Sequence, residues 1–294
     1  MRIGADGSGS LQSSDVTLAL AIDIGGTKLE VGLVDGDGTV LVARRAPTVT
    51  ADPWPGLAAL VTDVLALASE RPVALGCGCA GPMTPEGATV SPLNIAGWRE
   101  FPLRDRLVGL TGLPVVIDND AKALAVGEGW RGAARGATTY LAMVVSTGVG
   151  GGLVVDGRVL HGATGNAGHI GHLVVVPGGR PCVCGSRGCL EAEASGTAIA
   201  AITGRPAAEA GPDVIARTGR LVGRAVAEVA VLLDLPLAVI AGSVALGFGE
   251  PFFAAARAEA ERLARISYAR GLRIERAGLG DHGPLVGAAG LVLA

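Results

Sequence analysis

The stretch LALAIDIGGTKLEVGLVDGDGTVL, residues Leu18–Leu41, decides the fold class of this chain. An apolar run enters a Gly-Gly-Thr turn, and a second apolar run ends at DGDG, a pattern typical of a hairpin turn. The stretch therefore predicts a strand, a glycine turn, a second strand and a turn into a third strand.

The same plan recurs in YLAMVVSTGVGGGLVVDGRVL, residues Tyr140–Leu160. A shift of 121 positions places five residues of the first stretch on identical residues of the second: Leu20, Ala21, Val34, Asp35 and Gly36 fall on Leu141, Ala142, Val155, Asp156 and Gly157. Any two glycine-rich hairpins look somewhat alike. Here the length, the turn position and the following strand all agree, which favours an internal duplication.

Helical and strand-like stretches alternate along the rest of the chain. WPGLAALVTDVLALASE and GPDVIARTGRLVGRAVAEVAVLLDL have helical spacing, whereas PVALGCGCAGP, LPVVIDND and LAVIAGSVAL are short apolar runs that end in turn or polar residues. This alternation indicates an α/β fold, and the duplication predicts two related lobes with a cleft between them. We expect a flexible tail at 1–15, a smaller lobe at 16–118 joined by a C-terminal helix at 282–294, and a larger lobe at 119–281.

The composition excludes several classes of protein. Hydrophobic residues make up 49% of the 294 residues and charged residues 17%, which is far from a disordered composition. No run of basic residues marks a nucleic-acid surface, so we expect no nucleic-acid partner. The longest apolar run, Val226–Leu246, contains Glu228, Asp234 and Pro236, and we expect a helix and a strand there rather than a membrane span. The first residues lack the apolar core of a signal peptide, so we expect a cytoplasmic protein.

His172, Cys182, Cys184 and Cys189 form the pattern H-x9-C-x-C-x4-C. Thiolates together with an imidazole select zinc, and four protein ligands fill a tetrahedral site, so the pattern predicts a structural rather than a hydrolytic Zn²⁺. Unligated thiols are the alternative, but three cysteines within eight residues argue against it. Cys77 and Cys79 fall outside the pattern and are expected in the core.

The two glycine turns offer clusters of backbone N–H groups, which bind anions and most often phosphate. The first turn, DIGGTK, is not a Walker A loop, and it does not open a helix in a dinucleotide-binding unit. Alone, each turn is more typical of a plain hairpin. As a pair in duplicated units, the turns favour a nucleotide bound between the lobes.

AIDIGGTK, STGVGGG and AGSV are similar, in order and spacing, to the phosphate and adenosine motifs of sugar kinases, and the ROK family (repressors, open reading frames, kinases) matches best. The resemblance extends from about Leu18 to the end of the chain. It implies the actin-like fold, also called hexokinase-like or ribonuclease H-like, and ATP with Mg²⁺ in the cleft. By this resemblance the ATP-binding residues are Asp23, Gly25, Gly26, Thr27 and Lys28 at the first turn, Thr147 and Gly148 at the second, and Gly242 and Ser243 beside the adenosine.

VVIDNDAKAL ends a strand and starts a helix, and it delivers two aspartates, Asp118 and Asp120. For one of them we expect a helix N-cap. The functional interpretation is a base that accepts a hydroxyl proton during phosphoryl transfer. The stretch is similar to the family motif E/D-N-D-A-N, which implies that Asp120 is the base and Asn119 a sugar ligand. Lys122 departs from the usual Asn or Gln of that motif.

Further sugar-binding residues follow from the resemblance. SPLNIAGW, residues Ser91–Trp98, is similar to a sugar loop of the family with one residue inserted, and it implies that Asn94 bonds a sugar hydroxyl. The alternative for Asn94 is a turn residue. Gly81 would let the sugar approach the backbone. Glu191 matches a sugar-binding glutamate, and the counterpart of His172 touches the sugar while ligating zinc.

His169 stands where glucokinases of the family have a sugar-binding glutamate, because this chain reads GHIGH in place of GEIGH. A neutral imidazole accepts at one nitrogen and donates at the other, whereas an ionised carboxylate only accepts. An imidazole donor can meet an acetamido carbonyl, and bacterial N-acetylmannosamine kinases resemble this chain here, including AGHIGH. The alternative is a tolerated substitution in a glucokinase.

The sequence therefore predicts an ATP-dependent kinase acting at the 6-hydroxyl of a hexose or N-acetylhexosamine, first of all N-acetylmannosamine, and by resemblance a homodimer. A glucokinase of the same family stays open. A repressor of the family would need a DNA-binding helix-turn-helix, which we do not expect in the polar residues before Leu18. A non-enzymatic actin-like assembly protein would have no use for Asn94, Asp120 and a zinc-braced sugar loop.

Overall fold

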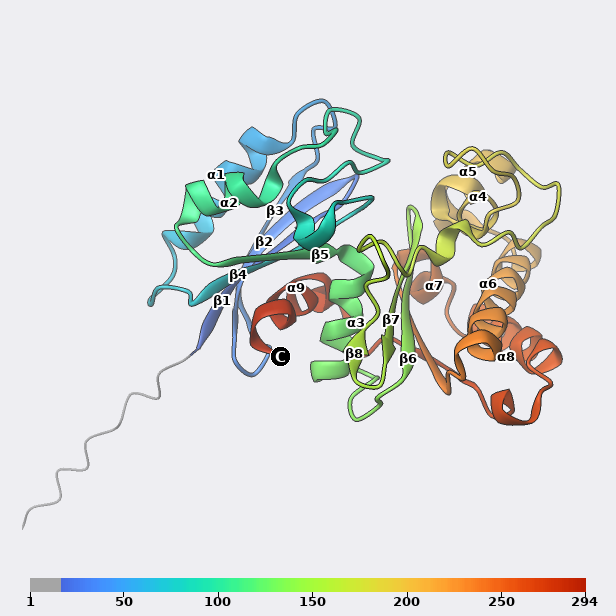
Figure 1. Cartoon of the computed structure of the whole chain (residues 1–294). Coiled ribbons are helices and arrows are strands. Elements are labelled where there is room, and N and C mark those ends of the chain that lie inside the picture. The colour runs from blue at the N-terminus through green and yellow to red at the C-terminus, as the bar shows by residue number, and fades with distance from the viewer. Residues whose placement is uncertain (1–16) are drawn as a thin grey trace, which may run out of the picture.

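The computed structural model describes residues 17–294, so the predicted tail at 1–15 lies outside the described residues. The chain builds two five-stranded mixed sheets, which Figure 1 shows as two halves of the molecule. The first sheet has the order β3-β2-β1-β4-β5, with β1 Leu18–Ile24, β2 Lys28–Asp35, β3 Val40–Pro47, β4 Ala74–Cys79 and β5 Val115–Asn119. The second has the order β10-β9-β6-β7-β8, with β6 Tyr140–Val145, β7 Val149–Val155, β8 Arg158–Val159, β9 Leu237–Ala241 and β10 Arg273–Arg276.

The helices connect and cover these sheets. They are α1 Trp54–Leu65, α2 Leu103–Thr111, α3 Asp120–Arg131, α4 Leu190–Ala194, α5 Gly196–Thr203, α6 Pro212–Leu233, α7 Ser243–Phe248, α8 Glu250–Leu263 and α9 Gly283–Leu293. The predicted α/β class and the long helix near 212–233 are confirmed. Within residues 17–294, every helix is too short or too polar to cross a membrane.

The predicted duplication is confirmed by the pairing of the strands. β1 pairs antiparallel with β2 and parallel with β4, and β6 pairs in the same way with β7 and β9. The hairpin register differs between the halves, however. Ile24 pairs with Leu29 but Val145 pairs with Val149, so the second turn is one residue shorter between its last paired residues. The repeat therefore preserves the order and direction of the strands but not the length of the turn.

Burial explains why the central strands are apolar at successive positions. All seven residues of β1 are buried, as expected for a strand covered on both faces, and Cys77 and Cys79 of β4 lie in the core as predicted. The C-terminal helix α9 packs on the first sheet, since Gly76 of β4 has no side chain and lies directly against the backbone carbonyl of Ala288. The C-terminal end of the chain thus contributes to the core beside β1.

Helix α3 lies beside α9 between the two sheets and contacts strands of both (Figure 1). It follows β5 of the first sheet directly and packs its first turn against β7 of the second. Glycines make this approach possible: a Cβ on Gly152 of β7 would lie 2.5 Å from the Ala121 oxygen and 2.7 Å from Lys122 Cα. The proposed boundary between lobes at 118/119 falls at the end of β5, just before α3, and the division into lobes stays a prediction.

Replacing Gly152 with Ala is expected to destabilise the protein by about 1–3 kcal/mol, because the added methyl meets backbone atoms that cannot rotate away. Denaturant unfolding measures the change. Gly109 of α2 is the matched control, since nothing lies within 4 Å of the Cβ it would gain and alanine favours a helix. Equal unfolding midpoints for the two alanine variants would show that β7 and α3 are not packed as described.

Candidate functional site

Asp120 stands at the junction of β5 and α3. The helix begins at Asp120, so the preceding residue occupies the N-cap position, and the Asn119 side chain accepts a hydrogen bond of 3.0 Å from the Ala121 amide. The prediction that Asp118 or Asp120 caps this helix is therefore wrong. Asp120 Oδ1 also accepts from the Ala121 amide at 2.9 Å, which leaves its second carboxylate oxygen for other partners.

A second carboxylate lies near Asp120. A Cβ on Gly78 of β4 would be 3.3 Å from Asp120 Cα and 3.7 Å from Asp23 Oδ1, so this glycine separates the two aspartates. Burial raises the pKa of Asp120, which the nearby Glu191 raises further. Burial and the Asp120 charge together raise the pKa of Asp23 to about 7. Both pKa values are raised because negative charge accumulates in a buried place. A divalent cation would offset that charge, and carboxylate oxygens are ligands that Mg²⁺ accepts.

The first glycine turn, residues 25–27, is held by its own backbone and by Thr48. The Gly25 amide donates to the Lys28 oxygen at 3.0 Å, and the Thr48 hydroxyl donates to the Gly25 oxygen at 2.7 Å. Gly26 lies against the predicted sugar residue Asn94, because a Cβ there would be 2.5 Å from Asn94 Nδ2. The turn that is predicted to hold phosphate is thereby next to the loop that is predicted to hold sugar.

Lys28 extends from this turn and is paired. Its ammonium donates to Glu30 Oε2 at 2.8 Å, and Arg45 donates to the other oxygen of the same carboxylate at 2.7 Å. Glu30 is fully buried, whereas the Lys28 side chain is 43% exposed. Two cations thus share one buried carboxylate and leave excess positive charge at the edge of the first turn.

The second glycine turn, residues 146–148, is braced from three elements. Thr197 of α5 donates through its hydroxyl to the Thr147 oxygen at 2.9 Å, and the Ser146 and Ser243 hydroxyls lie 2.9 Å apart. Glu191 of α4 accepts from the Val149 amide at 2.9 Å and lies against Gly148. Gly242, at φ +99°, lies directly against the Val145 oxygen, a position that no other residue type fits without strain.

The predicted sugar residues of the two halves meet at Gly81. A Cβ on Gly81 would lie 3.3 Å from His169 Nε2 and 3.6 Å from Asn119 Nδ2. The His169 ring stacks near the His172 ring, with centroids 5.9 Å apart. Burial lowers the pKa of His169, and the neighbouring His172 and Lys122 lower it further, which favours a neutral imidazole.

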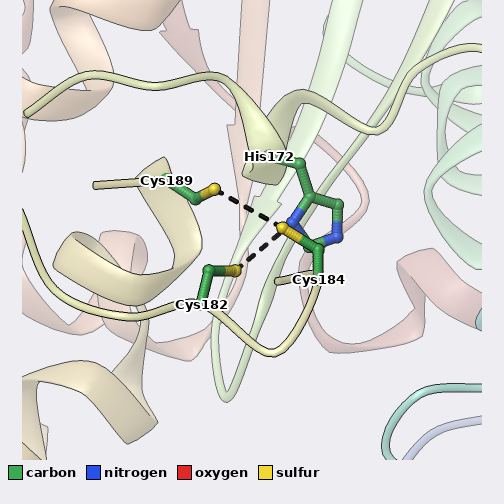
Figure 2. Close-up of side chains that lie close together, drawn as sticks. All are labelled: His172, Cys182, Cys184 and Cys189. Carbon is green, nitrogen blue, oxygen red and sulfur yellow. Dashed lines mark hydrogen bonds between the residues drawn. The ribbon is translucent and has the colours of Figure 1, made fainter. Parts of the chain in front are cut away.

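His172, Cys182, Cys184 and Cys189 converge on one point, as Figure 2 shows. Their ligand atoms all lie within 4.8 Å of one another, with Cys184 Sγ 3.7 Å from Cys189 Sγ and Cys182 Sγ 3.6 Å from His172 Nδ1. In a tetrahedron with Zn–S bonds of about 2.3 Å, two sulfurs are about 3.8 Å apart. The two separations given above are close to this value, and the set of three thiols and one imidazole is one that zinc prefers, so the four residues suit a zinc ion.

Two features of the site were missed by the sequence analysis. One is the pair Gly150 and Gly152 of β7, which lie directly against the first turn of α3. The other is the environment of Lys122, which is completely buried and bonds to the Gly165 oxygen at 2.6 Å. The available signal was a lysine at the motif position where the family usually has Asn or Gln, but its partner lies 43 residues away in the sequence.

Comparison with known proteins agrees with this arrangement. The ROK family profile matches residues 19–294. The chain belongs to the ROK family. This ROK protein is 38% identical over 250 residues to the N-acetylmannosamine kinase of Citrobacter koseri. The aligned region covers 78% of this chain and 84% of that kinase.

Two glucokinases are also similar to this ROK protein. The glucokinase of Halalkalibacterium halodurans is 40% identical over 195 residues, which make up 62% of this chain and 58% of the relative, so the match spans less than two thirds of that glucokinase. The crystal structure of a ROK family glucokinase from Streptomyces griseus, in complex with glucose and AMPPNP, superposes with a TM-score of 0.82 at 32% identity. That comparison covers 93% of this chain and 98% of the other. The predicted family and hexokinase-like fold are confirmed.

Proposed function

We propose that this ROK protein is an ATP-dependent sugar kinase that phosphorylates the 6-hydroxyl of a hexose or N-acetylhexosamine, with N-acetylmannosamine as the first candidate. One observation carries the proposal. The half-buried carboxyl of Asp120, with its raised pKa, lies beside Asp23 of the first hairpin and within the influence of Glu191 at the second. Relatives named glucokinase and N-acetylmannosamine kinase support the reaction class.

In this mechanism Asp120 is the general base. Oxygen O6 of the sugar forms a bond to the γ-phosphorus as the bond from that phosphorus to the ADP oxygen breaks, and ADP leaves with the bonding electrons. The 6-hydroxyl proton goes to Asp120. Burial supports this role, because a carboxylate with a raised pKa is a stronger base than an exposed one. The hydrogen bond from Ala121 holds the carboxyl group in one orientation.

The two glycine turns are the proposed phosphate sites. Backbone amides at 25–27 and 146–148 would face the phosphates, with Lys28 adding positive charge at the edge of the first turn, and Gly242 and Ser243 beside the adenosine. The Ser146–Ser243 contact supports this grouping, because it joins the second turn to the proposed adenosine residues. Asp23 would hold Mg²⁺, which supplies charge neutralisation for the phosphates when bound.

On the sugar side, we propose Gly81, Asn94, Asn119, His169, His172 and Glu191 as ligands. His169 is the residue that favours an N-acetylated sugar, because its imidazole can donate to an acetamido carbonyl. Its contact with Gly81 and its closeness to Asn119 support a role at the sugar end. A glucokinase is the second candidate, favoured by the 40% identity to the Halalkalibacterium halodurans enzyme.

The test is coupled ADP release with glucose, mannose, N-acetylglucosamine and N-acetylmannosamine. Changing His169 to Glu is expected to lower kcat/KM for N-acetylmannosamine relative to glucose by about 10- to 100-fold, because an unsatisfied buried polar group costs about 1–3 kcal/mol. The exposed His282 changed to Glu is the matched control and should not alter the ratio. A wild-type protein that prefers glucose would favour the second candidate, and sugar-independent filaments seen by light scattering would favour an assembly protein.

Three further parts belong to the proposal. Zn²⁺ in the His172–Cys189 cluster would be structural, since all four positions are filled by protein, and it would hold His172 and Glu191 in place. A homodimer is proposed by family resemblance, and sedimentation would measure it. A cytoplasmic location fits a set of cysteines suited to a metal rather than to disulfides.

A further inference from the structure

The ammonium of Lys122 is enclosed. The side chain is 0% exposed and has two acceptors, the Gly165 oxygen at 2.6 Å and Asp118 Oδ1 at 3.5 Å. Asp118 is also nearly buried, and its second oxygen lies 3.3 Å from His161 Nδ1. A buried charge is costly unless it is paired and hydrogen-bonded, so this arrangement indicates a specific purpose for the charge.

Lysine is an unusual choice in this chain. Of its 24 lysine and arginine residues only Lys28 and Lys122 are lysines. Lys28 belongs to the proposed ATP site, whereas Lys122 lies two residues after the proposed base. A compact ammonium can sit between one carbonyl and one carboxylate, whereas a planar guanidinium with five N–H groups needs more room and more acceptors. The enclosed position therefore suits lysine and not the basic residue that the chain uses elsewhere.

Both partners of Lys122 lead to one segment, residues 161–168, which we call the bridging loop. It carries the Gly165 oxygen and His161, and it ends directly before His169. At its centre, the Asn166 amide group accepts from the Met83 amide at 3.1 Å and donates to the Met83 oxygen at 3.0 Å. Met83 lies two residues after Gly81, so the bridging loop joins the second half of the chain to the Gly81 segment of the first.

We propose that Lys122 and Asn166 are positioning residues that hold the bridging loop and thereby fix His169 against Gly81, so that they determine sugar affinity without touching the sugar. The inference rests on the proposed function, because His169 and Gly81 are its sugar residues. Lys122 anchors the loop to α3, which carries Asp120, and Asn166 anchors it to the facing half. ATP is bound by other segments and does not depend on these bonds.

Two variants test the proposal and avoid a stranded buried charge. Asn166→Ala removes both bonds to Met83, and the double variant Lys122→Met with Asp118→Asn removes the ion pair while it preserves volume. Each is expected to raise the KM for the sugar about tenfold or more, because one or two lost hydrogen bonds are worth about a factor of ten in affinity. The KM for ATP and kcat are expected to stay within about twofold of the wild-type values. Lys122→Arg preserves the positive charge but is also expected to raise the KM for the sugar, because the guanidinium does not fit the enclosed position. Ala163→Ser, at an exposed position of the same loop, is the control.

Amide hydrogen exchange without ligands separates this inference from the proposed function. Faster exchange in residues 161–168 of both variants, with α6 unchanged, is expected if the bridging loop is held as described. Unchanged exchange, or an equal rise in the KM values for sugar and ATP, would overturn the inference. If the wild-type protein shows no sugar-dependent ADP release, the proposed function and the substrate part of the inference are overturned. The hydrogen-exchange measurement would still test whether the bridging loop is anchored as described.

Discussion

Asp120→Asn is expected to lower kcat about 10²- to 10⁴-fold, the range that a positioned general base contributes. The amide preserves the size of the side chain and still accepts a hydrogen bond from Ala121 at the start of α3. It does not take a proton from the 6-hydroxyl. Sugar affinity, measured by calorimetry without ATP, should therefore stay close to that of the wild-type protein.

The pH profile checks the same assignment. The proposed base Asp120 can accept a proton only when it is ionised, and burial raises its pKa. As the solution is acidified, kcat/KM should therefore begin to fall at a higher pH than it would with an exposed aspartate as the base. Asp105→Asn, at an exposed position of α2, is the control for the loss of one negative charge. Full turnover in the Asp120 variant would remove Asp120 from the chemistry and the proposed mechanism with it.

The second large effect is expected at the zinc cluster. Cys184→Ser should abolish binding of one zinc per chain and lower the free energy of unfolding by more than about 4 kcal/mol, since loss of a metal is among the few single changes of that size. Cys184 is exposed, so serine at this position should cost little if no metal is bound. Metal content by emission spectrometry and thermal unfolding measure both results.

The neighbouring Val183 supplies the matched control. It is 77% exposed in the same loop, and Val183→Ser should preserve both zinc and stability. Loss of zinc should also raise the KM for the sugar if, as proposed, the metal holds its ligand His172 and the nearby Glu191 in place. Wild-type protein purified without added metal that contains no zinc and unfolds at the same temperature as the Cys184 variant would contradict the assignment.

Most of the fold could be predicted from patterns that are local in the sequence. Apolar runs around the turns at 25–27 and 146–148 predicted both hairpins, and the repeat between them predicted two related lobes. The difference in hairpin register was not predictable, because pairing depends on how each turn closes and not on the residues that match. The N-cap at Asn119 was also missed, since the capping residue can be named only when the first residue of the helix is known.

The candidate site divides in a similar way. The cysteine spacing predicted a cluster that the structure assembles, because ligands close in sequence need only one loop to meet. The contact of Asn166 with Met83 spans 83 positions, and the packing of Gly152 on α3 joins two different sheets. No local pattern encodes such pairs, and they become visible only when the two halves are placed together.

By itself the sequence predicted the succession of strands and turns along each unit and the candidate metal-binding residues, and its resemblance to the family predicted the candidate base. Only the tertiary structure decided the environment of those groups: the raised pKa values of Asp23 and Asp120, the enclosure of Lys122 and the anchoring of the bridging loop. The physical reason is that strand and turn preferences act over a few residues. Desolvation and charge–charge interactions instead depend on every segment that packs around a group.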